Sequence, residues 1–131
     1  MLDFPRSRAA FFHGSQWDEE STKLNHDAAG VVTQIGKNIP ATESSGECVG
    51  LYRFTKEYSQ ELLASARTLL GSAGLHLFGH DALHCMIKNS ELPLYALDIS
   101  RYPSIEIDYP EDLRRAERSV LPGIMPALDL P

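Results

Sequence analysis

The chain has 131 residues, of which 43% are hydrophobic and 23% are charged, so it is of single-domain size and has enough apolar material for a core. This composition argues against disorder over most of the chain. The formal net charge of −6 argues against an electrostatic grip on nucleic acid or on an anionic membrane. A small anionic substrate stays open, because it needs only a few local positive groups.

The first residues include Asp3, Pro5 and Arg6 where a signal peptide needs an apolar run. No apolar run approaches the roughly 20 residues of a membrane span. We therefore expect a soluble, cytoplasmic protein. The two cysteines, Cys48 and Cys85, lack the spacing of a metal site and are most simply buried thiols, although a disulfide between them stays open.

Residues 1–20 have no clean hydrophobic period, and we interpret them as an irregular segment with one short element at most. Short strands are expected at residues 21–24 and 31–35. The most strand-like run is residues 47–54, which contains Gly50. A glycine inside a strand often marks a bulge or the close approach of a ligand.

Thr55 is suited to cap a helix that runs to about residue 70, where Gly71 is expected to stop it. A second helix is expected over residues 81–89, and a further strand over residues 94–99. This second helix follows a glycine-rich joint.

Three histidines, His76, His80 and His84, are spaced at four residues around this joint. On one continuous helix they would share a face and could form a metal site. The glycines of the joint make a continuous helix through His76 doubtful, and ordinary surface or core histidines are the alternative.

Residues 105–117 predict a short strand that runs straight into a helix. Ile105 and Ile107 alternate as in a half-buried strand. Pro110 suits the first helical position, and the two acids that follow it complement the helix dipole. Asp108 is therefore expected at a strand-to-helix junction, either aimed into a cleft as a metal ligand or serving as an ordinary helix-entry acid.

The mixture of strands and helices predicts an α/β fold with a mixed sheet and flanking helices. We divide the chain into an irregular segment at residues 1–20, one folded part at residues 21–122 and a loose tail at residues 123–131. The small number of strands suggests part of a larger sheet. Residues 47–54 are the expected exposed edge, through which the chain would self-associate or pair with another chain.

Residues 106–113, with the sequence EIDYPEDL, resemble the C-terminal signature of nucleotidyltransferases that couple a nucleoside triphosphate to a phosphorylated sugar, phosphocholine or a phosphonate. The resemblance implies a Rossmann-like fold and a catalytic Mg²⁺ ion. In that family the Asp of this signature is one of two carboxylates that hold the metal, and the matching residue is Asp108.

Two further segments resemble the same family. Residues 31–40 resemble a strand that leads to a lysine in contact with phosphate or acceptor, which implies a catalytic role for Lys37. Residues 46–54 resemble a G-E-x-x-G-L-x-x-F strand, which implies that Glu47 and Gly50 bind the acceptor substrate. The alternatives are a surface lysine for Lys37, an edge-strand acid for Glu47 and a bulge for Gly50.

The resemblance covers roughly residues 20–122 and only the acceptor-side, C-terminal half of the family's domain. The glycine-rich loop that binds the triphosphate and the upstream Asp that completes the metal site are not found. An intact relative would transfer a nucleoside monophosphate from a nucleoside triphosphate, with a weak preference here for CTP, to a phosphate or phosphonate, and release pyrophosphate. We expect this chain to be inactive alone.

Three hypotheses remain open. The chain is a partial enzyme that needs a complementing N-terminal chain, or a non-catalytic binding or assembly module, or an unrelated α/β domain with a chance match. For the first, a nucleotide and a small anionic substrate are the expected partners, and Lys37, Glu47 and Asp108 should converge on one cleft.

Overall fold

The computed structural model describes residues 6–13, 20–73 and 79–124. The chain forms two compact units with a boundary between Ile99 and Ser100, and each unit is described here by itself. This boundary lies inside the range 21–122 that the sequence led us to treat as one part. None of the described helices combines the length and the apolar character that crossing a membrane requires.

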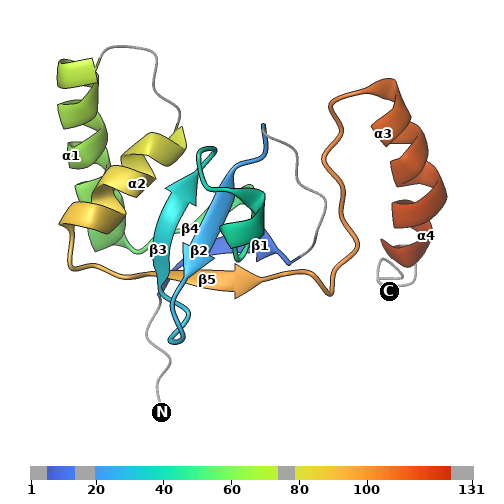
Figure 1. Ribbon diagram of the computed structural model, residues 1–131, viewed down its shortest axis with the longest axis horizontal. Helices are drawn as coiled ribbons and strands as arrows, with labels where there is room; N and C mark the ends of the chain where they lie inside the picture. The colour runs from blue at the N-terminus through green and yellow to red at the C-terminus, as the bar shows by residue number, and fades with distance from the viewer. Residues whose placement is uncertain (1–5, 14–19, 74–78, 125–131) are drawn as a thin grey trace. The chain divides into compact units, whose positions relative to one another are not determined.

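The first unit contains a five-stranded mixed sheet with the strand order β3-β2-β4-β1-β5 (Figure 1). The strands β3, β2, β4 and β1 are antiparallel to their neighbours, and β1 and β5 are parallel. The protein is therefore an α/β protein with an open mixed sheet and flanking helices, as expected. The strands are β1 (Ser7–Phe12), β2 (Lys23–His26), β3 (Val32–Gly36), β4 (Gly46–Arg53) and β5 (Leu94–Asp98).

Strand β1 is the one short element that the sequence analysis allowed within residues 1–20, but its place was not expected, because it lies inside the sheet between β4 and β5. Ala9, Ala10 and Phe11 are successive residues and are all buried, with exposed fractions of 0%, 2% and 4%. A strand that is buried on both faces has no alternation of apolar and polar residues. Strand β1 therefore lacks the alternation of apolar and polar residues by which we identified strands.

Strand β4 corrects the prediction that residues 47–54 form an exposed edge. It lies between β2 and β1, and Glu47 is the register partner of both Lys23 and Phe12. The edge strands are β3 and β5, and an isolated bridge between Val31 and Tyr95 joins them at one end. Self-association through an edge at β4 is therefore wrong, whereas association as such stays a prediction.

The turn between β2 and β3 is built around Asp27. Its Oδ1 accepts hydrogen bonds from the backbone N–H groups of Ala29 and Val31, at 2.8 and 2.9 Å. Gly30 has a φ of 78°, a left-handed conformation that glycine adopts without strain. The carbonyl of Gly30 then accepts a hydrogen bond from the N–H of Ala96, at 2.8 Å, which ties this turn to β5.

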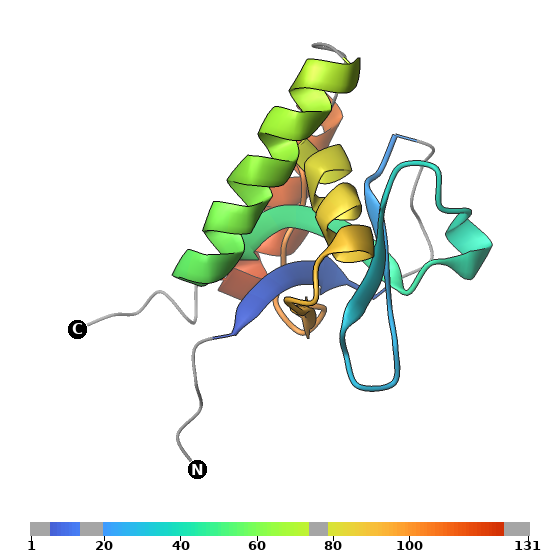
Figure 2. The same cartoon turned by 90° about the vertical axis from the view of Figure 1, so that its left-hand side faces the viewer.

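Two helices cover one face of the sheet, α1 (Lys56–Ala73) and α2 (Gly79–Asn89) (Figure 2). The capping role of Thr55 is confirmed, because its Oγ1 accepts the N–H of Tyr58 at 3.2 Å. The prediction that Gly71 stops the first helix is wrong, since α1 passes through it. A glycine in a helix costs only about 1 kcal/mol, so it does not end a helix by itself.

The core lies between these helices and the sheet. From the helices it takes Tyr58, Leu83 and Met86, each less than 4% exposed. Tyr58 stacks on Phe54 with ring centroids 5.2 Å apart, which fastens the first turn of α1 to the end of β4. The buried cluster is completed by side chains of the strands: Ala9, Phe11, Leu24, Val32, Ile35, Cys48 and Leu94.

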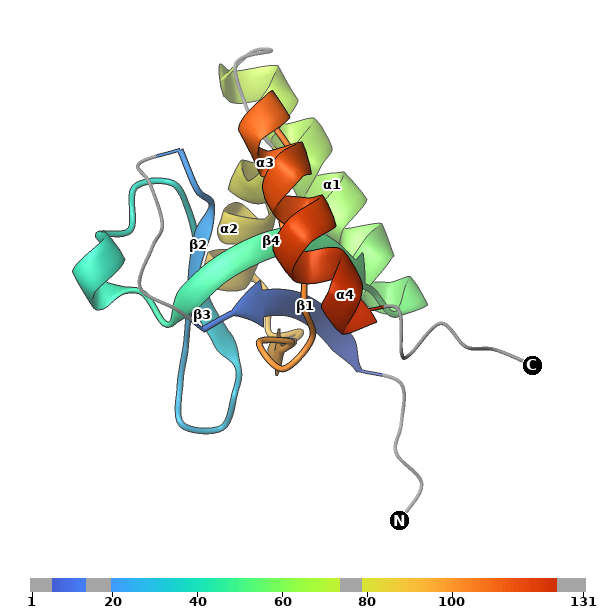
Figure 3. The ribbon, with the colours of Figure 1, turned by 90° about the vertical axis from the view of Figure 1, so that its right-hand side faces the viewer.

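The second unit contains one helical rod (Figure 3), formed by α3 (Pro110–Arg115), the π-helical segment Ala116–Val120 and α4 (Leu121–Ile124). Pro110 occupies the start of this helix, as predicted. The strand expected before it does not form, because residues 105–108 pair with no other strand in the described chain. Of the tail expected at residues 123–131, Gly123 and Ile124 are helical, and residues 125–131 lie outside the described residues.

We predict that Asp27→Ala destabilises the protein by about 1 kcal/mol, because two backbone N–H groups of the β2–β3 turn lose their acceptor. Asp27→Asn is the matched control, since it keeps the accepting oxygen and should leave stability close to the wild-type value. Urea unfolding followed by circular dichroism measures both. Equal losses in the two variants would show that the charge matters and the hydrogen bonds do not.

Candidate functional site

A polar cleft of about 540 Å³ lies between the turn that follows β3 and one side of α2. From the turn it takes Lys37 and from α2 it takes His80, His84 and Lys88. These three residues of α2 recur at every fourth position, so they share one side of the helix. Leu83 and Met86, between them, are buried in the core and hold α2 against the sheet.

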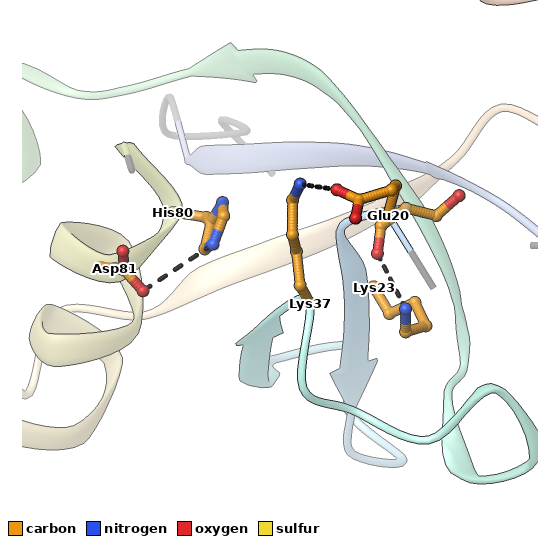
Figure 4. A network of polar contacts seen from close by, with 6 residues as sticks. Glu20, Lys23, Lys37, His80 and Asp81 are labelled. Carbon is orange, nitrogen blue, oxygen red and sulfur yellow. Dashed lines mark hydrogen bonds and ion pairs between the residues drawn. The ribbon is translucent and has the colours of Figure 1, made fainter. Parts of the chain in front are cut away.

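Lys37 follows directly on the end of β3, where the chain turns away from the sheet. Its Nζ lies 2.7 Å from Oε2 of Glu20, and Figure 4 shows the two side chains pointing toward one another. The carboxylate is 85% exposed, whereas the lysine side chain is 31% exposed. An exposed ion pair of this kind contributes little to stability, so an anion that binds Lys37 more tightly can replace the Glu20 carboxylate.

His80 and Asp81 lie in the first turn of α2 on the same cleft, with Nε2 and Oδ1 3.7 Å apart (Figure 4). His84 lies one turn further along, and its Nδ1 is buried without a hydrogen-bond partner among the described residues. Burial lowers the pKa of His84, and the charge of Lys88 lowers it further. The backbone of Ile35 and the charge of Asp81 act in the opposite direction but do not compensate.

The cleft carries charges of both signs. Lys37 and Lys88 are its ammonium groups, and Glu43 and Asp81 are its carboxylates. Lys88 makes no ion pair within the described part of the chain, and Asn38 adds an amide from the turn. A ligand that fits this lining combines an oxyanion with groups that donate hydrogen bonds.

A second hollow, an apolar pocket of about 410 Å³, meets the polar cleft at His80, which lines both. Its walls include Tyr52 and Phe54 of the sheet side and Leu62 and Leu83 of the helices. The rings of Tyr52 and Phe54 are nearly parallel, at 13°, with centroids 5.5 Å apart.

Cys48 also lines the apolar pocket, and its Sγ lies 3.2 Å from the hydroxyl oxygen of Tyr52. Burial raises the pKa of the Cys48 thiol and of the Tyr52 hydroxyl, so both stay protonated at neutral pH. Cys48 and Cys85 are both free, and no disulfide joins them. Cys48 is buried, as predicted, and Cys85 is partly buried.

The structure brings two of the predicted site residues close to His80. Lys37 lines the polar cleft and Gly50 lines the apolar pocket. Gly50 has a φ of 73°, and a Cβ built on it would meet nothing within 4 Å, so a side chain there is opposed by backbone strain and not by lack of space.

Glu47 points away from both hollows. Its neighbour Cys48 faces the helices, and successive side chains of a strand point to opposite faces. Across the strand pairs it stands opposite Lys23, a buried lysine whose Nζ donates to the carbonyl oxygen of Ser21 at 2.8 Å. Lys23 is not among the predicted site residues, because nothing in the sequence of a short strand indicates that its one lysine is buried.

Asp108 belongs to the second unit, where it is exposed. The carboxylate that serves the start of α3 is Asp112, whose Oδ2 accepts the backbone N–H groups of Asp108 and Tyr109 at 3.3 and 3.1 Å. The ordinary helix-entry role is therefore filled by Asp112. Lys37 lines the polar cleft and Glu47 does not, so these two do not share it, and only the position of Asp108 relative to the cleft stays a prediction.

The expected Mg²⁺ ion needs several oxygen ligands. Within residues 6–13, 20–73 and 79–124 no group of three or more His, Cys, Asp or Glu side chains is placed to hold a metal ion. Around Asp108, the acid Glu111 lies 3.4 Å from Arg114, and Asp112 is engaged at the helix start. These residues alone do not fit a magnesium site.

The histidine spacing that we noted in the sequence has a different meaning in the structure. His80 and His84 line the polar cleft, and His76 lies outside the described residues. Lys88 continues the same spacing by one further step. A search for cationic residues at helical spacing, and not for metal ligands alone, would have found this side of α2.

No protein-family model matches this sequence, and comparison with curated proteins finds no match.

We predict that acidification destabilises the folded protein through His84. Its pKa in the folded state lies below the ordinary value of 6.5, so below that pH the unfolded chain binds more protons than the folded one. This contribution to stability is fully present above pH 6.5 and is lost as pH falls through the lowered pKa.

The measurement is the melting temperature between pH 7.5 and pH 5. His84→Gln should lose less stability over this interval than the wild type. Lys88→Gln should lie between them, because the Lys88 charge is the second cause of the lowered pKa. An unchanged pH dependence in His84→Gln would contradict the assignment.

Proposed function

We propose that the polar cleft binds a small molecule with a phosphate or phosphonate group, in the acceptor-side role expected of a nucleotidyltransferase-like protein. The observation that carries the proposal is the meeting of Lys37 and Lys88, from two different elements, on one cleft with His80 and His84. A lysine acts as a point charge toward phosphate, and two of them from opposite walls can hold one oxyanion between them.

The electrostatics of the cleft favour exchange of one anion for another. Glu20 pairs with Lys37 from an exposed position, so a phosphate that enters the cleft competes with a weakly held carboxylate. The protein's net charge of −6 does not oppose this, because the pairing is local and distant charges are screened beyond about 10 Å in ordinary salt.

His84 couples anion binding to pH. A bound anion favours the protonated form of a neighbouring histidine, whereas burial and Lys88 favour its neutral form. Binding of phosphate is therefore accompanied by proton uptake. Glu43 and Asp81 supply acceptors for hydroxyl or ammonium groups of the same ligand, which suits a phosphorylated metabolite better than free phosphate.

Nucleotidyl transfer is the reaction that we propose for an intact relative, with the acceptor oxyanion attacking the α-phosphorus of a nucleoside triphosphate and pyrophosphate leaving. Positioning and charge neutralisation by Mg²⁺ accelerate such a reaction. The described residues supply no complete metal group, so turnover would require a complementing N-terminal chain. A non-catalytic binding module is the second candidate function, and the same lack of a metal group favours it.

We predict that Lys37→Ala and Lys88→Ala each weaken binding of inorganic phosphate and of phosphocholine by about fivefold or more, as expected for a lost hydrogen bond to a charged group. Lys56→Ala is the matched control, because Lys56 is an exposed lysine of α1 that does not line the cleft. Calorimetric titration measures the affinities.

Nuclear magnetic resonance adds a second reading of the same experiment. Phosphate should raise the pKa of His84 in the wild type. In Lys56→Ala, phosphate should raise the pKa of His84 by the same amount. Equal affinities in all three lysine variants, or no phosphate binding by the wild type, would refute the proposed site.

We also predict that the isolated chain releases no pyrophosphate above background from CTP with Mg²⁺ and phosphocholine. If it acquires activity with a complementing N-terminal chain, Asp108→Asn should abolish that activity while changing the melting temperature little, since Asp112 serves the helix start. Turnover by the isolated chain would contradict the expected need for a second chain. Activity that survives in Asp108→Asn would remove Asp108 as a metal ligand.

A further inference from the structure

We infer that the ligand of the polar cleft carries a flat aromatic group that lies in the apolar pocket. The inference rests on the proposed function and narrows its substrate class to anions attached to an aromatic ring. This separates the expected ligand from the sugar phosphates and phosphocholine that the family resemblance implies.

The first step is that the two hollows have a lining residue in common. His80, in the first turn of α2, lines both the polar cleft and the apolar pocket. Lys37 and Lys88 line the polar cleft, whereas Tyr52 and Leu62 line the apolar pocket. A single small molecule can therefore place a charged end and an apolar end on the two sides of one side chain.

The second step is the lining of the apolar pocket. The polar atoms that Tyr52 and Cys48 bring to it are hydrogen-bonded to one another at 3.2 Å and stay protonated. What remains for a ligand is mostly carbon, from Phe54, Leu62 and Leu83. A carbohydrate would lose most of its hydration there and could gain hydrogen bonds only from Thr22, His80 or the backbone, whereas an apolar group gains by its burial.

The third step is the shape of the aromatic wall. Tyr52, Phe54 and Tyr58 form a stack with interplanar angles of 13° and 6° and centroid distances of 5.5 and 5.2 Å. Within this stack the rings pack on one another, so a planar ligand would stack on a face left free, such as the outer face of Tyr52, which lines the pocket. A cavity of about 150 Å³ holds benzene, and the pocket offers about 410 Å³.

The fourth step concerns Gly50, which lines the pocket but has no side chain to fill it. A Cβ at this position would have no atom within 4 Å, so the space beside it is open. This explains how Gly50 could serve a ligand without any chemical group of its own, as a residue that leaves room.

The test compares the affinities of inorganic phosphate, methyl phosphate and phenyl phosphate, measured by calorimetry on the wild-type chain. Phenyl phosphate should bind at least tenfold more tightly than methyl phosphate, and inorganic phosphate and methyl phosphate should be similar. Equal affinities of the phenyl and methyl esters overturn the inference and leave the proposed phosphate site standing. Failure of all three to bind overturns both.

Two matched variants localise the gain. Leu62→Phe fills part of the apolar pocket and should remove most of the advantage of phenyl phosphate while leaving inorganic phosphate unchanged. Leu63→Phe is the control, since Leu63 is 59% exposed and does not line the pocket. Unchanged binding of inorganic phosphate by Leu62→Phe shows that the variant is folded. If this variant still binds phenyl phosphate more tightly than methyl phosphate, the phenyl ring lies outside the apolar pocket and the inference is refuted.

Discussion

Strand β1 is paired along both of its edges, with β4 on one side and β5 on the other, and the rest of the first unit depends on this arrangement. Cys48 and Tyr52 stand opposite Phe11 and Ala9 in the register of β1 and β4. The walls of the apolar pocket are therefore fixed by the pairing of β1. Loss of this strand would leave β5 without its partner and would open the sheet beneath both helices.

Helix α2 joins the core to the candidate site. Leu83 and Met86 are buried on the side that faces the sheet, whereas His80, His84 and Lys88 line the polar cleft. Because both sets belong to one short helix, the positions of His80, His84 and Lys88 are set by packing and not by contacts with one another. Binding in the cleft is then expected to require little rearrangement of the backbone, since the lysine and histidine side chains are already on one side.

Much of the fold could be predicted where the hydrophobic pattern was regular. The strands near residues 31–35, 47–54 and 94–99 and the helix after Thr55 are present. Strand β1 was missed because it is buried on both faces, and residues 105–108 were taken for a strand because Ile105 and Ile107 alternate, although no partner strand pairs with them. Lys37, a predicted site residue, lines the polar cleft, but its neighbours on α2 come from a distant part of the chain, and spacing alone does not show which elements meet.

The parallel pairing of β1 with β5 also constrains how the protein can fold. Ser7 stands opposite Leu94, so one side of the sheet joins segments from nearly opposite ends of the first unit. Contacts between residues so distant in sequence are slow to form, because a long loop must close before they contribute. During synthesis on the ribosome, one edge of β1 therefore stays unpaired until residues 94–98 have emerged. Once residues 46–53 have emerged and paired with β1, its other edge stays open until β5 follows, and an open strand edge of this kind favours association with other chains.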